Sequence, residues 1–259
     1  MLSLLRGEWY QVRKSLLVKI VLGITLITSL YFGIKLIDET YFDTYKALDQ
    51  CYILYGGGSL CSQMQDSVGV LLFASLLAGW LISSGFENQI IQGAISCGKS
   101  RGSIYCSKLL VYYGVVTINC LFYWLGTGIP AFVKNGLGTP EICGNLCQIH
   151  YIIGMMLAGI LAYISLFSLC GVVAFLSRKV GVTMGICFAG ILFGGNLLAS
   201  ILSESMMKIF NYTPLGLFNQ VLKLDVSWSD MLLTACISLI WTILICGLGY
   251  LKFRKTELK

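Results

Sequence analysis

The sequence predicts an all-α integral membrane protein with a single transmembrane domain, residues 1–259. It has six transmembrane helices, an N-terminal amphipathic interfacial helix and a short cytoplasmic helix between spans two and three. Hydrophobic residues make up 57% of the chain and charged residues 12%, about half the charged share of a soluble domain. The mean hydropathy is +0.81. Six apolar stretches are long enough to cross the hydrocarbon core, which takes about 20 helical residues.

Each apolar stretch is expected to be a helix, because an open strand in lipid leaves its backbone N–H and C=O groups unpaired. The sequence lacks the alternating ten-residue segments that are typical of membrane β-barrels. The first stretch is too long for a signal peptide, and no small-residue cleavage site follows it. The expected spans are Leu16–Ile37, Ser67–Ser84, Leu109–Leu125, Tyr151–Leu176, Val180–Leu202 and Met231–Leu251.

Residues 1–15 are expected to form a short amphipathic helix. Its apolar residues recur at helical spacing and are Leu2, Leu5, Trp9 and Val12. The basic residues lie elsewhere on the helical wheel. Such a helix lies in the inner interface, with its tryptophan at the level of the headgroups. The alternative is an irregular basic flank that only sets the topology.

The loops predict that both termini are cytoplasmic. Most lysines and arginines fall in the N-terminal segment, in the loops after the second and fourth spans, and in the C-terminal tail. The two sizeable loops on the other side, 38–66 and 204–230, are richer in acids. Because basic residues are retained on the cytoplasmic side, the net charge of +6 indicates membrane orientation rather than nucleic-acid binding.

The stretch GAISCGKS, Gly93–Ser100, matches the phosphate-loop pattern G-x-x-x-x-G-K-[ST] at every fixed position. A working phosphate loop connects a buried strand to a helix, so that backbone N–H groups face the phosphates. Here the string lies between two membrane spans, with no sheet to mount it and no aspartate to hold Mg²⁺. We therefore expect no nucleotide at Lys99.

A short amphipathic helix over residues 86–98 is expected instead. Its apolar residues share one face: Phe86, Ile90, Ile91, Ala94 and Ile95. Glu87 lies in the first turn, where a negative charge favours the helix dipole. Gly98 suits the C-cap of this helix, and Ser103 is a candidate cap for the next one.

The run FENQIIQGAISCGKSRGSIYCSK, Phe86–Lys108, resembles the cytoplasmic loop of type-two ATP-binding-cassette (ABC) permeases, with Ile95 in place of the family's leucine. The matching positions are Phe86, Glu87, Asn88, Ile91, Gly98, Ser100, Arg101, Tyr105 and Lys108. The N-terminal amphipathic helix, the six spans and the large first external loop extend the resemblance over the whole chain.

The resemblance implies a permease subunit that binds no cofactor itself. It would work in a complex of two permease chains, identical or different, with two ATPase subunits that hold ATP and Mg. In that family the helix between spans two and three is a coupling helix, which docks on the ATPase. The resemblance assigns this coupling to Phe86, Glu87, Ile90, Ile91, Ile95 and Arg101.

The spans contain no Asp, Glu, Arg or His at depth, so a proton- or sodium-driven cycle has no evident ionisable site. No Ser-His-Asp set, carboxylate pair or HExxH motif predicts an enzyme. The small size is similar to that of exporters of antimicrobial or phenol-soluble peptides, which implies a bacterial plasma membrane. Apolar residues suited to an amphipathic cargo are Met155, Met156, Phe167, Phe188 and Trp241. The alternative is a non-transporting immunity or sensory subunit that binds toxic peptides.

Four cysteines are expected on the oxidising outer side, and Cys51–Cys61 with Cys143–Cys147 is the simplest of three pairings. Disulfides and free thiols both remain open there. No metal site is expected, because the outer side has no C-x-x-C and the chain has one histidine, His150.

The fifth span is rich in small residues, which allow close helix approach. These are Gly181, Gly185, Gly190 and Gly194, and Asn196 is the one strong polar group of the span. One interpretation is packing inside the subunit. The other is a dimer interface, which the resemblance favours because the family pairs two permeases through their first and fifth spans.

Overall fold

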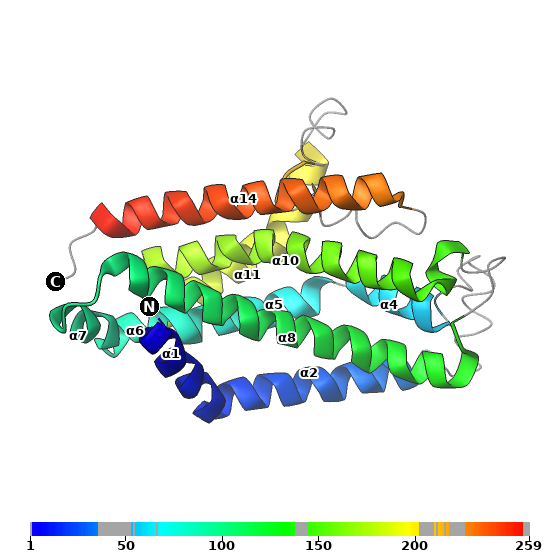
Figure 1. Cartoon of the computed structure of the whole chain (residues 1–259), viewed down its shortest axis with the longest axis horizontal. Coiled ribbons are helices and arrows are strands. Elements are labelled where there is room, and N and C mark those ends of the chain that lie inside the picture. Colours follow the sequence, from blue (N-terminus) through cyan, green and yellow to red (C-terminus); the bar gives the residue numbers. More distant parts are fainter. Residues whose placement is uncertain are drawn as a thin grey trace.

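The computed structural model describes residues 2–35, 53, 55–65, 67–137, 144–201, 210, 212–214, 216–217 and 226–255. For some of these, 191–201 among them, it describes the backbone alone. All regular structure in these ranges is helical, which confirms the all-α expectation for the described part of the chain. The helices run side by side as an elongated bundle (Figure 1).

The long helices lie over the expected spans. The first two are α2 (Leu16–Lys35) and a continuous stretch of α5 (Ser67–Ala78), η2 (Gly79–Ser83) and α6 (Ser84–Glu87). The others are α8 (Arg101–Asn135), α10 (Ile149–Ser177), α11 (Val180–Ile201) and α14 (Trp228–Lys255). Among the described residues, five stretches are long and apolar enough to cross a membrane. The sixth, α11, has a described apolar stretch that ends at Gly190. These helices indicate a multi-pass membrane protein.

The N-terminal helix α1 (Leu2–Lys14) meets α2 at an angle, and Ser15 separates the two (Figure 1). The Val18 N–H points at the Ser15 hydroxyl oxygen, 3.5 Å away, so Ser15 caps the start of α2. On α1, Val12 is buried and Leu5 is partly buried against the core. Two residues of the predicted apolar face thus pack on the bundle, whereas Trp9 of the same face is 37% exposed.

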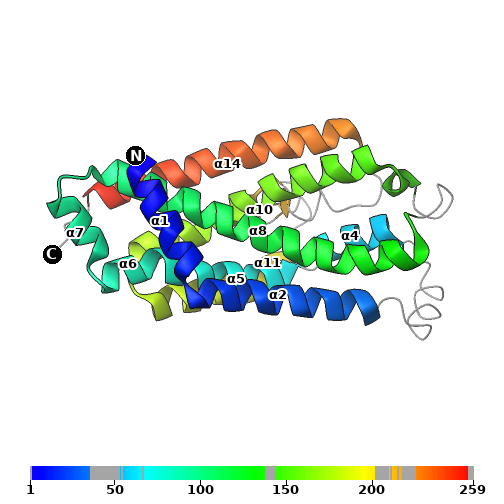
Figure 2. The same cartoon turned by 60° about the horizontal axis from the view of Figure 1, so that its bottom comes forward.

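Helices α8 and α10 carry most of the buried side chains. Helix α2 packs along α8, α14 packs along α10, and α5 packs against α11. In both views α1, the C-terminal end of α14 and the short helix α7 (Ile90–Ser96) lie at one end of the bundle (Figures 1 and 2). This end is called the termini end below. The topology thus brings α1, the last turns of α14 and the loop between spans two and three to the same end of the bundle.

The opposite end carries α4 (Gly56–Gln65) and the turn η3 (Gly144–Cys147). Helix α4 packs on α8 and belongs to the segment 38–66, whose residues 38–52, 54 and 66 lie outside the described residues. The Tyr163 hydroxyl on α10 donates to the Met64 carbonyl at 2.9 Å, which ties α4 to the core. The segment expected as an external loop therefore ends in a packed helix.

Candidate functional site

At the termini end, the segment expected as one helix over residues 86–98 is two helices. Helix α6 ends at Glu87, and α7 begins at Ile90. Between them Gln89 has φ 57°, a left-handed conformation that is uncommon for a residue other than glycine. The break turns the chain, and as a result Phe86 and Ile90 do not share a single helix face.

Phe86 lies in the core instead of on the expected surface. Its ring is 5.9 Å from Phe175 on α10 and 6.1 Å from Phe253 on α14, measured between centroids. Tyr105 on α8 packs on the same two rings. Aromatic rings at these distances attract one another beyond their area burial. This cluster joins the end of the second span to three other spans.

The expected apolar docking face of Phe86, Ile90, Ile91 and Ile95 is therefore divided by burial. Ile91 is buried like Phe86, and Ile95 is half-buried against the core. Ile90 is 43% exposed. Around it Glu87, Asn88 and Gln89 are exposed. The surface that this segment presents is therefore polar over residues 87–89, with the partly exposed apolar side chain of Ile90 next to it.

Glu87 caps a helix, but not the one expected. A carboxylate oxygen of Glu87 accepts the Val180 N–H of α11 at 2.9 Å. The first N–H groups of a helix lack partners inside it and carry the positive end of the dipole, so a carboxylate stabilises them. Glu87 thus links the loop after the second span to the start of the fifth, a contact that sequence spacing does not reveal.

The phosphate-loop string GAISCGKS joins two helices. Gly98 has φ 78° just past the end of α7, as expected for a C-cap glycine, and the Lys99 N–H donates to the Ala94 carbonyl. The next helix is capped by Ser100, whose hydroxyl accepts the Ser103 N–H at 3.3 Å. The expectation that Ser103 is the cap is wrong, because Ser103 already lies inside α8.

Arg101 opens α8 and reaches the C-terminal end of the chain. Its guanidinium donates to the Arg254 carbonyl of α14 at 3.0 Å. A cation favours the negative end of a helix dipole. Arg101 therefore helps to hold the last span beside the loop. This contact is structural and is distinct from the expected role of Arg101 in coupling.

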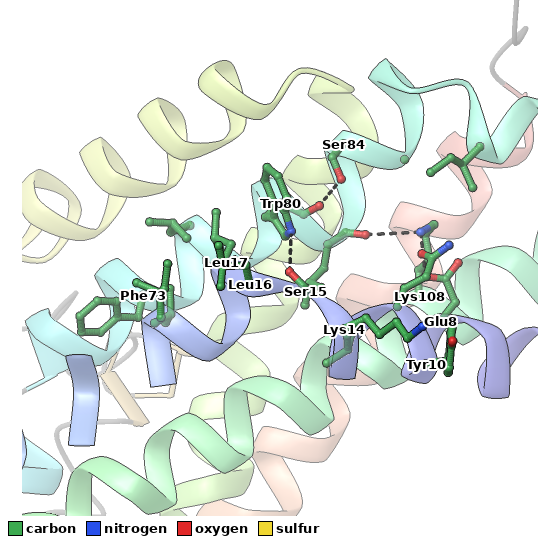
Figure 3. Close-up of a pocket in the computed structure, with 18 of the residues that line it drawn as sticks. Glu8, Tyr10, Lys14, Ser15, Leu16, Leu17, Phe73, Trp80, Ser84 and Lys108 are labelled. Atoms are coloured by element: carbon green, nitrogen blue, oxygen red, sulfur yellow. Dashed lines mark hydrogen bonds and ion pairs between the residues drawn. The ribbon is translucent and has the colours of Figure 1, made fainter. Parts of the chain in front are cut away.

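Two residues of this end were not predicted as a site: Glu8 on α1 and Lys108 on α8. Their charged atoms are 3.0 Å apart, with side chains 17% and 3% exposed (Figure 3). The Lys108 ammonium also donates to the Leu81 carbonyl of η2 at 3.4 Å. Leaving either charge unpaired in such a place costs several kcal/mol. The pair therefore holds α1 to the second and third spans.

The sequence carries only a weak signal for this pair. Glu8 is the one acid in the segment 1–15, and Lys108 directly precedes the expected third span. The expected third span begins only at Leu109, so its bounds give no sign that Lys108 is packed. In the structure α8 starts at Arg101, so Lys108 is already inside the packed bundle.

Other expected site residues are distributed as follows. Met155 and Phe167, expected to suit a cargo, are buried in the core, while Phe188 is 43% exposed. Cys61 is buried on α4, and burial raises the pKa of its thiol to about 12. The expected pairs Cys51–Cys61 and Cys143–Cys147 are not tested, because Cys51 and Cys143 lie outside the described residues and nothing is described of the Cys147 side chain. The same holds for the surroundings of Gly194 and for the Asn196 side chain.

His150 stacks on the Trp228 ring, with the two ring centroids 6.0 Å apart. Within the described residues, no three His, Cys, Asp or Glu side chains gather in a way that could hold a metal ion.

No protein-family model matches this chain, and a search of curated proteins finds no match.

Proposed function

We propose that the chain is the transmembrane permease subunit of an ABC exporter, driven by a separate ATPase subunit. The observation that carries this proposal is the α6–α7 segment. It joins the second and third spans at the termini end, exposes Glu87, Asn88, Gln89 and Ile90, and is anchored in the core through Phe86 and Ile91. A loop whose surface residues are exposed and whose core residues are held by packing suits docking by a partner that moves it.

The contacts beneath the loop supply routes for such a movement. Phe86 reaches α8, α10 and α14 through the aromatic cluster. Glu87 holds the start of α11. The Lys108 ammonium joins α1 and η2. A displacement of α6 and α7 is thus passed to six helical elements at once, because packed contacts move together rather than deform.

The second span also contains an irregular turn at which the helix can bend. Residues Gly79–Ser83 form a π-helix, which is rare and is found mostly as single turns at functional sites. In it the Ser83 hydroxyl is 2.7 Å from the Thr183 hydroxyl of α11 and donates to the Ala174 carbonyl at 3.1 Å. We propose that this turn is the hinge of the second span during transport.

The proposed assembly has two permease chains and two ATPase chains in a bacterial plasma membrane, with both termini cytoplasmic. The positive-inside distribution of charge supports this orientation, since the basic loops and both chain ends belong to one side. ATP and Mg belong to the ATPase subunits. An amphipathic or antimicrobial peptide is the proposed cargo, on the strength of the family resemblance and of the chain's small, apolar build.

The test is the recovery of an ATPase with the chain. The full chain is tagged, purified in mild detergent from the membranes of its host cell, and assayed for a copurifying subunit that hydrolyses ATP. Ile90→Asp replaces the exposed apolar side chain of this segment with a charge, and it should lower the recovered ATPase about tenfold or more. Ile149→Asp is the matched control, since Ile149 is 63% exposed at the opposite end.

Glu87→Gln separates docking from capping, because the amide oxygen can still accept the Val180 N–H. A loss of ATPase recovery in this variant, with unchanged thermal stability, is expected if the charge faces a partner. If no ATPase copurifies, or if Ile90→Asp and Ile149→Asp behave alike, the export function fails. The non-transporting immunity or sensory subunit then becomes the better description.

A further inference from the structure

A groove of about 840 Å³ runs along the outside of the bundle at the termini end (Figure 3). One wall is formed by α1 and α2 and the other by α5, η2 and α6, and Ile90 of α7 and Lys108 of α8 complete the lining. It lies between α2, which packs along α8, and α5, which packs against α11. Its volume lies within the range of small-molecule sites, about 300–1,000 Å³.

The walls of the groove are apolar over most of their length. On α2, Ile20 is 50% exposed and Ile24 is 44% exposed, although both face this hollow. Phe73 and Leu76 of α5 stand opposite them. This part belongs to two membrane spans, so what covers it in the bilayer is hydrocarbon.

The end of the groove near α1 is polar and carries a net positive charge. Glu8 and Lys108 both line it, but they neutralise one another at 3.0 Å. Lys14 also lines it, with its ammonium 4.7 Å from the centroid of the Tyr10 ring. One positive charge is therefore left over at the polar end of an apolar trough.

Trp80 marks the boundary between the two parts. Its indole N–H donates to the Ser15 hydroxyl at 3.2 Å across the groove (Figure 3). Tryptophan is enriched at the membrane interface, where its ring is apolar and its N–H is polar. The order of side chains from Lys14 through Trp80 to Phe73 thus follows the order of headgroup, interface and acyl chain.

We propose that this groove binds one anionic glycerophospholipid. An acyl chain lies along Ile20, Ile24 and Phe73, and the phosphate is held by the Lys14 ammonium. The charge left over selects an anionic headgroup over a zwitterionic one, and the apolar side chains of α2 and α5 line the space for the chain. The bound lipid then fills the space between the first two spans beside the Glu8–Lys108 pair. This inference does not depend on the transport function.

The test uses tryptophan quenching by lipid. The full chain is reconstituted in nanodiscs of phosphatidylcholine with a minority of phosphatidylglycerol, and one of the two lipids carries bromine on its acyl chain. The Trp80 signal is taken as the difference between the wild type and Trp80→Phe. Brominated phosphatidylglycerol should quench Trp80 about fivefold more per molecule than brominated phosphatidylcholine, since one surface lysine contributes about 1 kcal/mol.

Matched variants separate the groove from general surface charge. Lys14→Glu should remove the preference, whereas Arg13→Glu, the same change at an exposed neighbour that does not line the groove, should keep it. Ile20→Phe should lower quenching by both lipids. Ile27→Phe should not, because Ile27 is 68% exposed on α2 but lies outside the groove.

Three results overturn the proposal: equal quenching by both lipids, an equal effect of Arg13→Glu and Lys14→Glu, or no quenching of Trp80 by either. The last result would mean that another occupant, such as a second copy of the chain, fills the groove. If Lys14→Glu does not fold, the wild-type ratio of the two lipids still decides the matter.

Discussion

Among the surfaces of this protein that carry glycines, two differ clearly in what lies against them. The first is the contact of α2 with α8, called the α2–α8 seam. A Cβ on Gly33 would lie 2.9 Å from the Thr127 carbonyl oxygen, and one on Gly126 would lie 2.8 Å from the Ser29 Cβ. The second surface is α11, where a Cβ on Gly181, Gly185 or Gly190 would meet nothing within 4 Å.

The difference shows that the same residue type serves two purposes. In the seam, glycine lets two backbones approach closely, which is how membrane helices gain packing where lipid removes the hydrophobic driving force. On α11 the three glycines make no such contact within the described part of the chain. The interpretation of internal packing therefore has no contact to support it at these positions. We propose that they lie in the interface with the second permease chain.

The largest effect is expected from Gly33→Leu. Backbone atoms of α8 occupy the space that the side chain needs, so one helix has to move, and overpacking of this kind costs about 2–3 kcal/mol. The measurement is unfolding by sodium dodecyl sulfate in mixed micelles. Gly23→Leu is the control on the same helix, since a Cβ there meets nothing within 4 Å. Equal destabilisation of the two variants would contradict the tight seam.

A smaller effect is expected from Thr25→Val. The Thr25 hydroxyl donates to the Asn119 side-chain oxygen at 2.8 Å, in the buried middle of the seam. Hydrogen bonds between membrane helices contribute about 0.6 kcal/mol on average and up to about 1.7. We expect a loss of about 1 kcal/mol in the same assay. Thr28→Val should change little, because Thr28 donates only to carbonyls of its own helix.

The smallest effect on the stability of the chain is expected from Gly190→Leu. The side chain enters open space, so the free energy of unfolding should change by no more than about 0.5 kcal/mol. The dimer measured by cross-linking in membranes should nevertheless be lost. Gly247→Leu on α14, which also has open space around its Cβ, should leave both quantities unchanged. A retained dimer in Gly190→Leu would remove α11 from the interface.

Much of the architecture was predictable because a membrane helix is recognised by the apolar composition of a continuous stretch of the chain. The apolar stretches, the amphipathic start and the Gly98 cap depend on residues that are neighbours in the chain. The division of the predicted docking face was not predictable in this way. Phe86 and Ile90 fit one helical face by spacing, and only the left-handed turn at Gln89 separates the buried ring from the exposed side chain.

By itself, the sequence predicted a multi-pass membrane protein, the approximate positions of its long apolar helices, and a phosphate-loop string without a sheet to support it. These follow from the hydrophobic effect and from the need to pair backbone groups within a helix. The tertiary structure alone decided that Glu87 caps α11, that Glu8 pairs with Lys108 across 100 positions of the chain, and that a groove opens between α2 and α5. Those contacts depend on how helices that are distant in the sequence pack against one another. The periodicity within a single helix does not specify that packing.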